Sequence, residues 1–254
     1  MEPTLKTILI TQARTGSTRL PNKVLKKING EELLRIHLNR LKQVKGVDKL
    51  MVATTTDTKD QMIVDLCAQM NIPTYRGSED NVLDRFYKAT KAFAPQWVIR
   101  VTSDCPLIDP HLIEAVLSCA QVNDADYCSN VLVEHFPDGQ DVEVFKFSAL
   151  QQAWEMATLN SDKEHVTPFI RKNSTFFGKT TFKALNFPCI ADYNDIRMTV
   201  DEQRDFDMME QLIHHLGTDK DWLTYTKFII NNNLKDLNAD ILRNEGYAKS
   251  LQKD

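Results

Sequence analysis

The chain has 254 residues, of which 42% are hydrophobic, and its net charge at pH 7 is -4. This length suits one large α/β domain with a sizeable core, and the acidic balance argues against a surface that coats nucleic acid. No window approaches the ~20 apolar residues that cross a bilayer, and no secretory hydrophobic region opens the chain. The five cysteines are scattered without a C-x-x-C pair, as in proteins with reduced thiols. We therefore expect a cytoplasmic protein that binds neither nucleic acid nor a membrane.

Strands and helices alternate through the first half of the chain. Short apolar runs predict four strands at 8–10, 49–54, 71–75 and 97–102. Apolar residues at helical spacing predict four helices at 31–44, 60–70, 82–94 and 110–120. Strands separated by helices of this length indicate βαβ units and a parallel sheet. Ligands of such sheets lie beyond the carboxyl ends of the strands.

The pattern changes after about residue 126. We expect further strands at 127–133, 141–147, 179–186 and 196–200, and further helices at 148–159, 162–172, 203–216 and 221–231. The tail, 234–254, is polar with scattered apolar residues, and neither a linker nor an internal repeat divides the chain. The sequence therefore predicts a single domain over 1–254, with an inserted α+β portion at about 127–195.

The loop after the first strand is rich in cations. Residues 12–23 include Arg14, Arg19 and Lys23, all beyond the end of a buried strand. Gly16 lets the backbone approach a ligand closely because it has no Cβ. This composition suits a polyanion such as a triphosphate. The alternative is an ordinary solvated basic loop, since both the Walker A ending and the G-x-G-x-x-G fingerprint are absent.

Two aspartates are expected at the same edge of the sheet. Asp104 follows the strand at 97–102, and Asp201 follows the one at 196–200. Carboxylates there suit a hard cation such as Mg²⁺, held between them and a triphosphate. The structural alternatives are that Asp104 caps a turn and that Asp201 caps the helix at 203–216. Polar residues at 76–85 follow the third strand and can meet a base and ribose, although Ser78 or Asp80 can equally cap the next helix.

Six segments, in order, resemble the cytidylyltransferases that make CMP-activated acidic sugars. They are Q-A-R-x-x-S-x-R-L-P-x-K-V-L, R-G-S-x-x-N-V-L-x-R, R-V-T-S-D-C-P-L-I, F-P-D-G-Q-D-V-E-V-F, E-H-V-T-P and R-M-T-V-D-E. The chain is most similar to the spore-coat polysaccharide biosynthesis protein F branch, and more distantly to acylneuraminate and 3-deoxy-manno-octulosonate cytidylyltransferases. The resemblance implies an α/β nucleotide-diphospho-sugar transferase (GT-A-like) fold, with a mostly parallel mixed sheet between helices. It also implies CTP, Mg²⁺, pyrophosphate release and a homodimer formed through the inserted portion.

The resemblance also implies roles for individual residues. The nucleotide would be bound by Gln12, Ala13, Arg14, Ser17, Arg19, Lys23, Arg76 and Ser78, the last two at the cytosine and ribose. Asp104 and Asp201 would hold the metal and, with Arg14 and Lys23, form the catalytic set. In the inserted portion, Gln140, Glu143 and His165 would bind the acceptor, and His165 could donate to it or assist its deprotonation. The alternative for the acidic residues there is a solvated outer face of a strand.

The sequence departs from the octulosonate enzymes in ways that leave the acceptor open. Gln12 stands where those enzymes have proline, Asn22 where they have glycine, and 54–57 differs from their Thr-Asp-Asp pattern. The leading hypothesis is a Mg²⁺-dependent cytidylyltransferase that acts on an acidic sugar or another small anionic acceptor in polysaccharide or glycan precursor synthesis. One alternative is a GT-A glycosyltransferase, although Pro106 stands where its D-x-D motif needs a second aspartate. The other is a non-catalytic nucleotide-binding subunit on the same fold.

Overall fold

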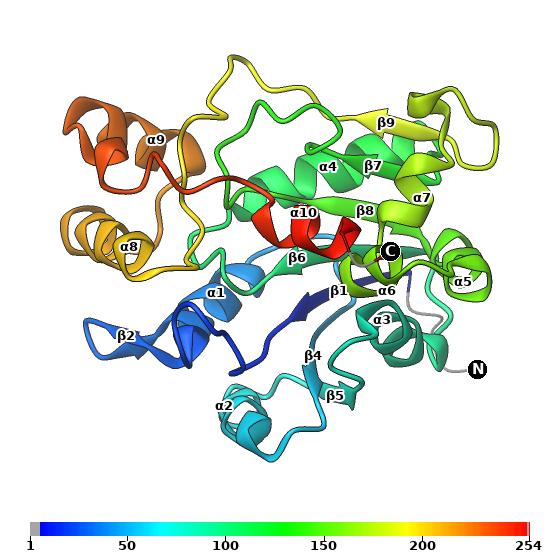
Figure 1. Ribbon diagram of the computed structural model, residues 1–254, viewed down its shortest axis with the longest axis horizontal. Coiled ribbons are helices and arrows are strands. Elements are labelled where there is room, and N and C mark those ends of the chain that lie inside the picture. Colours follow the sequence, from blue (N-terminus) through cyan, green and yellow to red (C-terminus); the bar gives the residue numbers. More distant parts are fainter. Residues whose placement is uncertain (1–5, 253) are drawn as a thin grey trace.

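A computed structural model describes residues 6–252 and 254, and a seven-stranded sheet forms its centre (Figure 1). The strand order is β5-β4-β1-β6-β8-β7-β9. The strands are β1 (Thr7–Gln12), β4 (Lys49–Thr55), β5 (Thr74–Gly77), β6 (Trp97–Thr102), β7 (Tyr127–Ser129), β8 (Glu143–Lys146) and β9 (Ala184–Asn186). All neighbouring pairs are parallel except β6–β8 and β7–β8. The predicted mostly parallel mixed sheet is therefore confirmed.

Helices cover both faces of this sheet. They are α1 (Leu33–Leu41), α2 (Gln61–Gln69), α3 (Val82–Lys91), α4 (Pro110–Val122), α5 (Phe147–Met156), α6 (Asn160–His165), α7 (Pro168–Lys172), α8 (Gln203–Leu216), α9 (Trp222–Asn231) and α10 (Glu245–Leu251). Successive residues of a strand point to opposite faces. Leu9 of β1 accordingly packs in one core with α1, α2 and α4, while Ile8 and Ile10 pack in another with α3 and α5. No helix among the described residues has the length and apolar character to cross a bilayer.

The first helix begins two residues later than the spacing predicts. Glu31–Glu32 form a short strand, β3, that pairs antiparallel with β2 (Lys27–Ile28). Asn29 and Gly30 join the two strands with positive φ values of 51° and 85°. An Asn-Gly pair in this conformation is the preferred two-residue hairpin turn. The hairpin therefore takes the residues that would have formed the first turn of α1.

The helix expected at 162–172 is wrong as a single element, because the chain breaks between α6 and α7. Pro168 lacks the amide hydrogen that a continuous helix needs, and it disfavours helical backbone in the residue before it. Val166 has a positive φ of 72° at the break. This break turns α7 away from α6, and both helices then contribute residues to one cavity.

The strand expected at 196–200 is also wrong, since this segment does not join the sheet. Its one ladder contact among the described residues is an isolated bridge between Asp138 and Arg197. Ile196, Met198 and Val200 alternate into a third core beneath α8 and α9. The alternation that imitates a strand therefore reflects an extended segment with a core on one side and a polar cavity on the other.

Gly139, in the loop between β7 and β8, fixes this extended segment in place. Its φ is +105°, and a Cβ there would lie 2.6 Å from the carbonyl carbon of Met198 and 2.7 Å from the amide nitrogen of Thr199. We expect Gly139→Ala to lower the free energy of unfolding by about 2–4 kcal/mol, because backbone strain and a clash with main-chain atoms combine. Urea denaturation measures this change. Gly178→Ala is the control, because Gly178 has a φ of +73° and open space around its Cβ; an equal loss in both variants would contradict the clash.

Candidate active site

A cavity of about 1080 Å³ opens beyond the carboxyl ends of β1 and β6. The loop after β1 and the start of α3 line it, together with α6, α7 and the C-terminal segment. Figure 1 shows α10 beside α6, although the two are some 80 residues apart in sequence, and the two helices are in contact. The cavity thus gathers residues from the whole chain at the edge where a parallel sheet binds ligands.

Lys23 lies between the two aspartates that the sequence singled out. Its Nζ is 3.1 Å from Oδ2 of Asp104 and 2.7 Å from Oδ1 of Asp201. Burial lowers the pKa of Lys23, but attraction to Asp104 and Asp201 outweighs burial and raises it above its ordinary value. For Asp104 the effects have the opposite signs. Burial raises its pKa, but attraction to Lys23 together with hydrogen bonds outweighs burial and lowers the pKa below its usual range. Lys23 and Asp104 are therefore both charged at neutral pH.

Backbone contacts bring Asp201 to Asp104. The amide of Val200 donates to the carbonyl of Asp104 at 2.8 Å, so the extended segment docks directly on the turn after β6. Asp201 is not the helix cap: Glu202 is the N-cap of α8 and forms a capping box with Asp205. The amide of Asp201 donates to the Asp205 carboxylate at 2.9 Å. The side chain of Asp201 itself lines the cavity.

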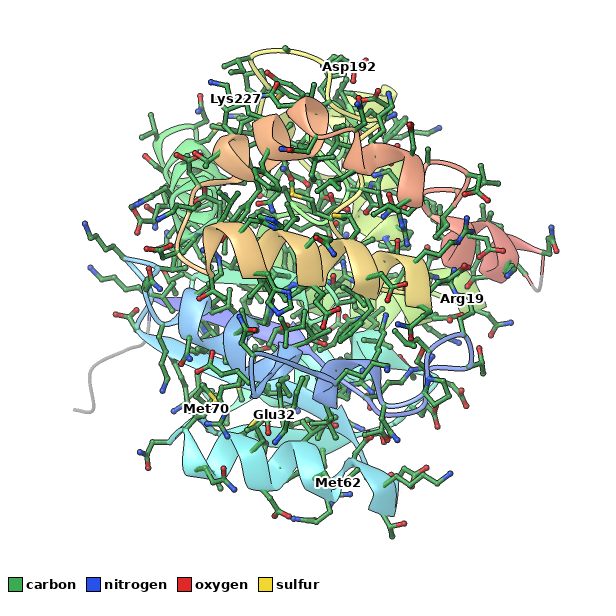
Figure 2. The ribbon with its side chains drawn as sticks, turned by 90° about the vertical axis from the view of Figure 1, so that its left-hand side faces the viewer. Arg19, Glu32, Met62, Met70, Asp192 and Lys227 are labelled. Atoms are coloured by element: carbon green, nitrogen blue, oxygen red, sulfur yellow. The ribbon has the colours of Figure 1, made fainter. Side chains whose placement is uncertain are left out.

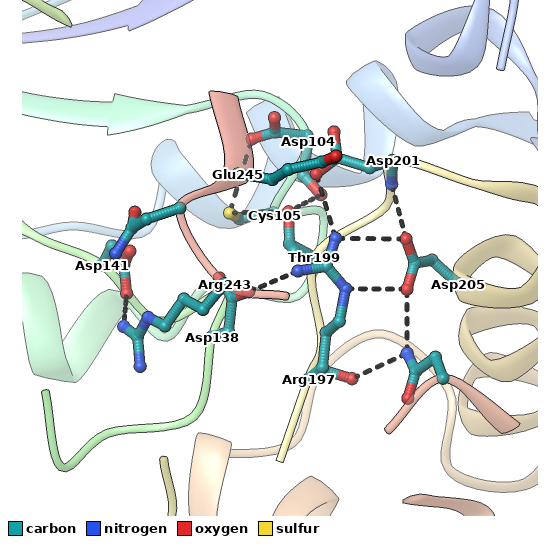
Figure 3. A network of polar contacts seen from close by, with 12 residues as sticks. Asp104, Cys105, Asp138, Asp141, Arg197, Thr199, Asp201, Asp205, Arg243 and Glu245 are labelled. Carbon is teal, nitrogen blue, oxygen red and sulfur yellow. Dashed lines mark hydrogen bonds and ion pairs between the residues drawn. The ribbon is translucent and has the colours of Figure 1, made fainter. Parts of the chain in front are cut away.

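Two arginines complete the charge pattern around Asp201. Arg19 lies 3.2 Å from Asp201 and 2.9 Å from Glu245, and Figure 2 shows it on the side of the molecule where α10 lies. Arg197 donates to Asp201 at 3.0 Å and to Asp205 at 2.9 Å (Figure 3). Sequence reasoning missed Arg197, although a cation inside an otherwise apolar alternating run is a visible signal. Asp201 therefore contacts Lys23, Arg19 and Arg197 together.

The other loop residues that the sequence predicted for nucleotide binding face the same cavity. Gln12, Ala13, Arg14 and Ser17 all line it, and the Arg14 side chain is 48% exposed in an ion pair of 2.6 Å with Glu79. Arg85, which sequence reasoning also missed, lines the cavity as well and donates to the carbonyl of Ser78 at 2.8 Å. These cations thus converge on one space, as a polyanion site requires.

Arg76 and Ser78 do not line the cavity. The Arg76 guanidinium donates to the carbonyls of Thr55 at 3.0 Å and Asp57 at 2.8 Å. Ser78 accepts from the amide of Asn81 at 3.0 Å, and Asn81 rather than Ser78 or Asp80 caps α3. The structure therefore gives both predicted base contacts roles in holding neighbouring loops.

The three predicted acceptor residues lie in different surroundings. Glu143 lines the cavity, pairs with Arg100 and accepts from Tyr127 at 2.6 Å and Thr167 at 2.5 Å, so it is not a solvated strand residue. Burial raises the pKa of Glu143, but attraction to Arg100 and Arg171 together with the hydrogen bonds outweighs burial and lowers the pKa below its ordinary value. Gln140 is fully buried, bonds Asp109 and Leu107, and does not line the cavity.

His165 lines the cavity beneath the C-terminal segment. Its Nε2 lies 2.9 Å from Oγ of Ser250, and its ring meets Tyr247 edge-on at 5.1 Å. Burial lowers its pKa to about 4, so the imidazole is neutral at pH 7. Arg243 anchors the same segment by an ion pair of 2.7 Å with Asp141 (Figure 3). The polar tail, for which the sequence predicted no element, therefore forms a wall of the site.

Asp104 and Asp201 fit a magnesium ion. Mg²⁺ is usually bound by one or two carboxylates, with the other positions filled by water and substrate phosphates. The two aspartates already face one cation, the Lys23 ammonium, and both line the cavity. Within the described part of the chain, no group of three or more His, Cys, Asp or Glu residues forms a closed metal centre. This donor set therefore suits a metal that arrives with a phosphate ligand.

A buried histidine supports the turn that carries Asp104, and it makes stability depend on pH. His37 of α1 donates from Nδ1 to the carbonyl of Cys105 at 2.9 Å, so its Nε2 accepts from Thr11 at 3.0 Å. Burial lowers its pKa to about 4. Below pH 6.5 the unfolded chain therefore binds a proton that the folded chain does not.

We expect the free energy of unfolding to fall as pH decreases from about 6.5 to 4, by up to about 1.4 kcal/mol per pH unit for this histidine. His37→Gln should be less stable than the parent at pH 7 but show a shallower acid dependence. His165 contributes with the same sign in both proteins, so the difference between their slopes isolates His37. Denaturation series at several pH values measure both slopes, and equal slopes would contradict a neutral buried His37.

Comparison with known proteins establishes the class of this fold and site. A solved cytidylyltransferase from Leptospira borgpetersenii superimposes with a TM-score of 0.86 and 26% identity, over 94% of this chain and 100% of that one. The fold is therefore that of the nucleotidyltransferases, as predicted. A family model described as "Cytidylyltransferase" matches residues 8–245. The chain belongs to the cytidylyltransferase family and is a nucleotidyltransferase.

Curated relatives agree with this family. An uncharacterized protein of Methanocaldococcus jannaschii is 38% identical over 96% of this chain and 99% of its own length. The spore coat polysaccharide biosynthesis protein SpsF of Bacillus subtilis is 31% identical over 83% of this chain and 87% of its own length. A 3-deoxy-manno-octulosonate cytidylyltransferase of Elusimicrobium minutum is 32% identical over 44% of each chain. The resemblance to the SpsF branch and to the octulosonate enzymes is thereby confirmed.

Proposed function

We propose that this enzyme transfers CMP from CTP to an acidic sugar or another small anionic acceptor and releases pyrophosphate. The observation that carries the proposal is the convergence of Arg14, Arg19 and Lys23 on the cavity that also holds Asp104 and Asp201. Cations and paired carboxylates in one space match a nucleoside triphosphate with its metal. The name of the B. subtilis relative supports a place in polysaccharide precursor synthesis. We place this activity in the cytoplasm and expect a homodimer.

The loop cations act on the leaving group. In an in-line displacement, an acceptor oxygen forms a bond to the α-phosphorus while the bond from that phosphorus to the β-phosphate oxygen breaks. Negative charge then grows on the departing pyrophosphate. Arg14, Arg19 and Lys23 are positioned to stabilise this charge, and fixed donors of this kind lower activation barriers most where charge develops. The planar guanidinium of Arg14 or Arg19 matches paired phosphate oxygens in a way that lysine cannot.

Asp104 and Asp201 would hold a magnesium ion. When bound there, such an ion neutralises charge on phosphoryl oxygens and orients the reacting groups. The protein's own part is to hold both carboxylates facing the cavity. Lys23 and the docking of Val200 on Asp104 maintain that arrangement.

The acceptor is expected in the part of the cavity formed by α6 and α7. Glu143 and His165 line the cavity, together with Lys163, which forms no ion pair with a carboxylate within the described residues. Cations without a carboxylate partner favour an anionic acceptor. Gln140 would act there only by supporting the chain around Asp141, since its amide is buried away from the cavity.

The inserted portion at about 127–195 supports the expected dimer. It carries exposed apolar side chains at Phe176, Phe177 and Ile190. An interface between two copies would cover such side chains. Light scattering on the purified protein tests this part of the proposal, and a monomer at micromolar concentration would contradict it.

A pyrophosphate-release screen tests the proposed reaction. Each of the four nucleoside triphosphates is combined with a panel of acidic acceptors, with Mg²⁺ and with a chelator. We expect release only with CTP, an acceptor and the metal. Transfer of a sugar from a nucleotide sugar without pyrophosphate would instead indicate the glycosyltransferase alternative. CTP binding without turnover on any acceptor would indicate a non-catalytic subunit.

A further inference from the structure

A buried carboxylate that the proposed mechanism does not use lies directly beneath the cationic loop. Asp60, at the start of α2, is 1% exposed and does not line the cavity. Its Oδ1 accepts from the amide of Thr15 at 2.8 Å and from the Thr15 hydroxyl at 2.7 Å. Its Oδ2 accepts from the hydroxyls of Thr54 at 3.1 Å and Thr55 at 2.5 Å, and from the Thr55 amide at 3.2 Å. Asp60 therefore joins the loop after β1 to the carboxyl end of β4.

Thr15 is the residue around which the loop folds. Its carbonyl accepts from the amide of Ser17 at 2.8 Å and from the amide of Asn22 at 3.2 Å. Its own amide and hydroxyl both point the other way, into Asp60. Arg14 precedes this anchor, Arg19 lies in the segment that the Thr15 carbonyl closes at Asn22, and Lys23 directly follows Asn22. Fixing Thr15 therefore fixes the directions from which all three cations enter the cavity.

We propose that Asp60 is a positioning residue for phosphate recognition, which holds the cationic loop by Thr15 so that its cations meet the β- and γ-phosphates together. This inference rests on the proposed function, because it assigns a cause to the loop geometry that the reaction uses. Asp60 touches neither nucleotide nor metal in this scheme. Rigid support of this kind determines whether charged groups reach a ligand within a fraction of an ångström.

Electrostatics supports a permanent anion at this position. Burial raises the pKa of Asp60, but the hydrogen bonds from Thr55, Thr15 and Thr54 outweigh burial and lower it below its ordinary value. The carboxylate can satisfy all five donors because it only accepts, whereas a neutral amide would have to turn its NH₂ group toward one set of them. The loop thus lies on an anion that keeps its charge throughout the neutral range.

The test compares CTP with CMP, because only CTP carries the phosphates that the loop cations meet. Calorimetric titration without acceptor gives both affinities for the parent protein and for Asp60→Ala. We expect Asp60→Ala to bind CTP about tenfold or more weakly, with CMP affinity changed by less than about threefold, since misplacing charged groups by about 1 Å has effects of this size.

The matched control is Asp109→Ala. Asp109 is also a buried carboxylate that accepts from two backbone amides, those of His111 at 2.8 Å and Trp222 at 2.9 Å, but it lies outside the cavity.

Thr15 provides a second, milder pair of variants in case Asp60→Ala does not fold. Thr15→Val removes only the hydroxyl contact and should lower the CTP-to-CMP affinity ratio, whereas Thr15→Ser keeps the hydroxyl and should restore it. An unchanged ratio in folded Asp60→Ala or in Thr15→Val, or an equal loss in Asp109→Ala, would overturn the positioning role. A parent protein without preference for CTP over CMP would instead contradict the proposed function itself.

Discussion

Asp104→Asn is expected to reduce nucleotidyl transfer by about 1000-fold or more while the protein remains folded. Asparagine keeps the shape of the side chain but removes the negative charge that a divalent cation requires. Lys23 then retains Asp201 as its partner at 2.7 Å, so the local structure persists. Pyrophosphate release at saturating CTP and acceptor measures the rate, and thermal denaturation confirms the fold.

Asp84→Asn is the matched control for this variant. Asp84 is also a largely covered aspartate paired with a lysine, Lys88 at 2.9 Å, but it lies outside the cavity. Its replacement should leave the rate within about twofold of the parent, as is usual for a surface ion pair. Near-normal turnover in Asp104→Asn would contradict a role for Asp104 in binding the metal.

Lys23→Ala is expected to weaken CTP binding by about 100-fold and CMP binding by less than about threefold. CMP lacks the β- and γ-phosphates that the ammonium would meet, so the loss should appear almost entirely with the triphosphate. A charge-assisted contact that is largely covered, as Lys23 is at 13% side-chain exposure, contributes about 2–3 kcal/mol. Calorimetric titration with the two nucleotides measures the difference.

Lys27→Ala controls for the loss of a nearby positive charge. Lys27 pairs with Glu32 at 3.2 Å, its side chain is 58% exposed, and it lies outside the cavity. The Lys27→Ala variant should change neither the CTP affinity nor the CMP affinity by more than about twofold. Equal losses of CTP affinity and CMP affinity in Lys23→Ala would contradict a contact between Lys23 and the β- and γ-phosphates.

The first half of the fold could be predicted from sequence because its strands are short apolar runs and its helices are amphipathic. β6 has the predicted bounds, and β4 differs by one residue. The second half of the fold could be predicted less well from the sequence. Segment 196–200 alternates like a strand, yet it borders a core and a cavity instead of a ladder. Periodicity reports which side chains are buried, but it does not report what buries them.

The centre of the site was predictable for a similar reason. Lys23 and Asp104 each follow a neighbouring parallel strand, so the topology alone brings them to one edge. Side-chain direction was not predictable: Arg76 lies in β5, near its carboxyl end, but its guanidinium turns toward the loop after β4. Glu245 and Arg243 come from a polar tail without periodicity, and only the tertiary fold brings them to Arg19 and Asp141.

The order of the chain has a consequence for how the enzyme is made. Every strand of the described sheet ends by Asn186, whereas Glu245 and Tyr247, which wall the cavity, come some sixty residues later. A nascent chain on the ribosome therefore carries all of its sheet well before it carries this wall. Because domains generally fold as units during synthesis, the catalytic cleft is complete only once this last wall has been made.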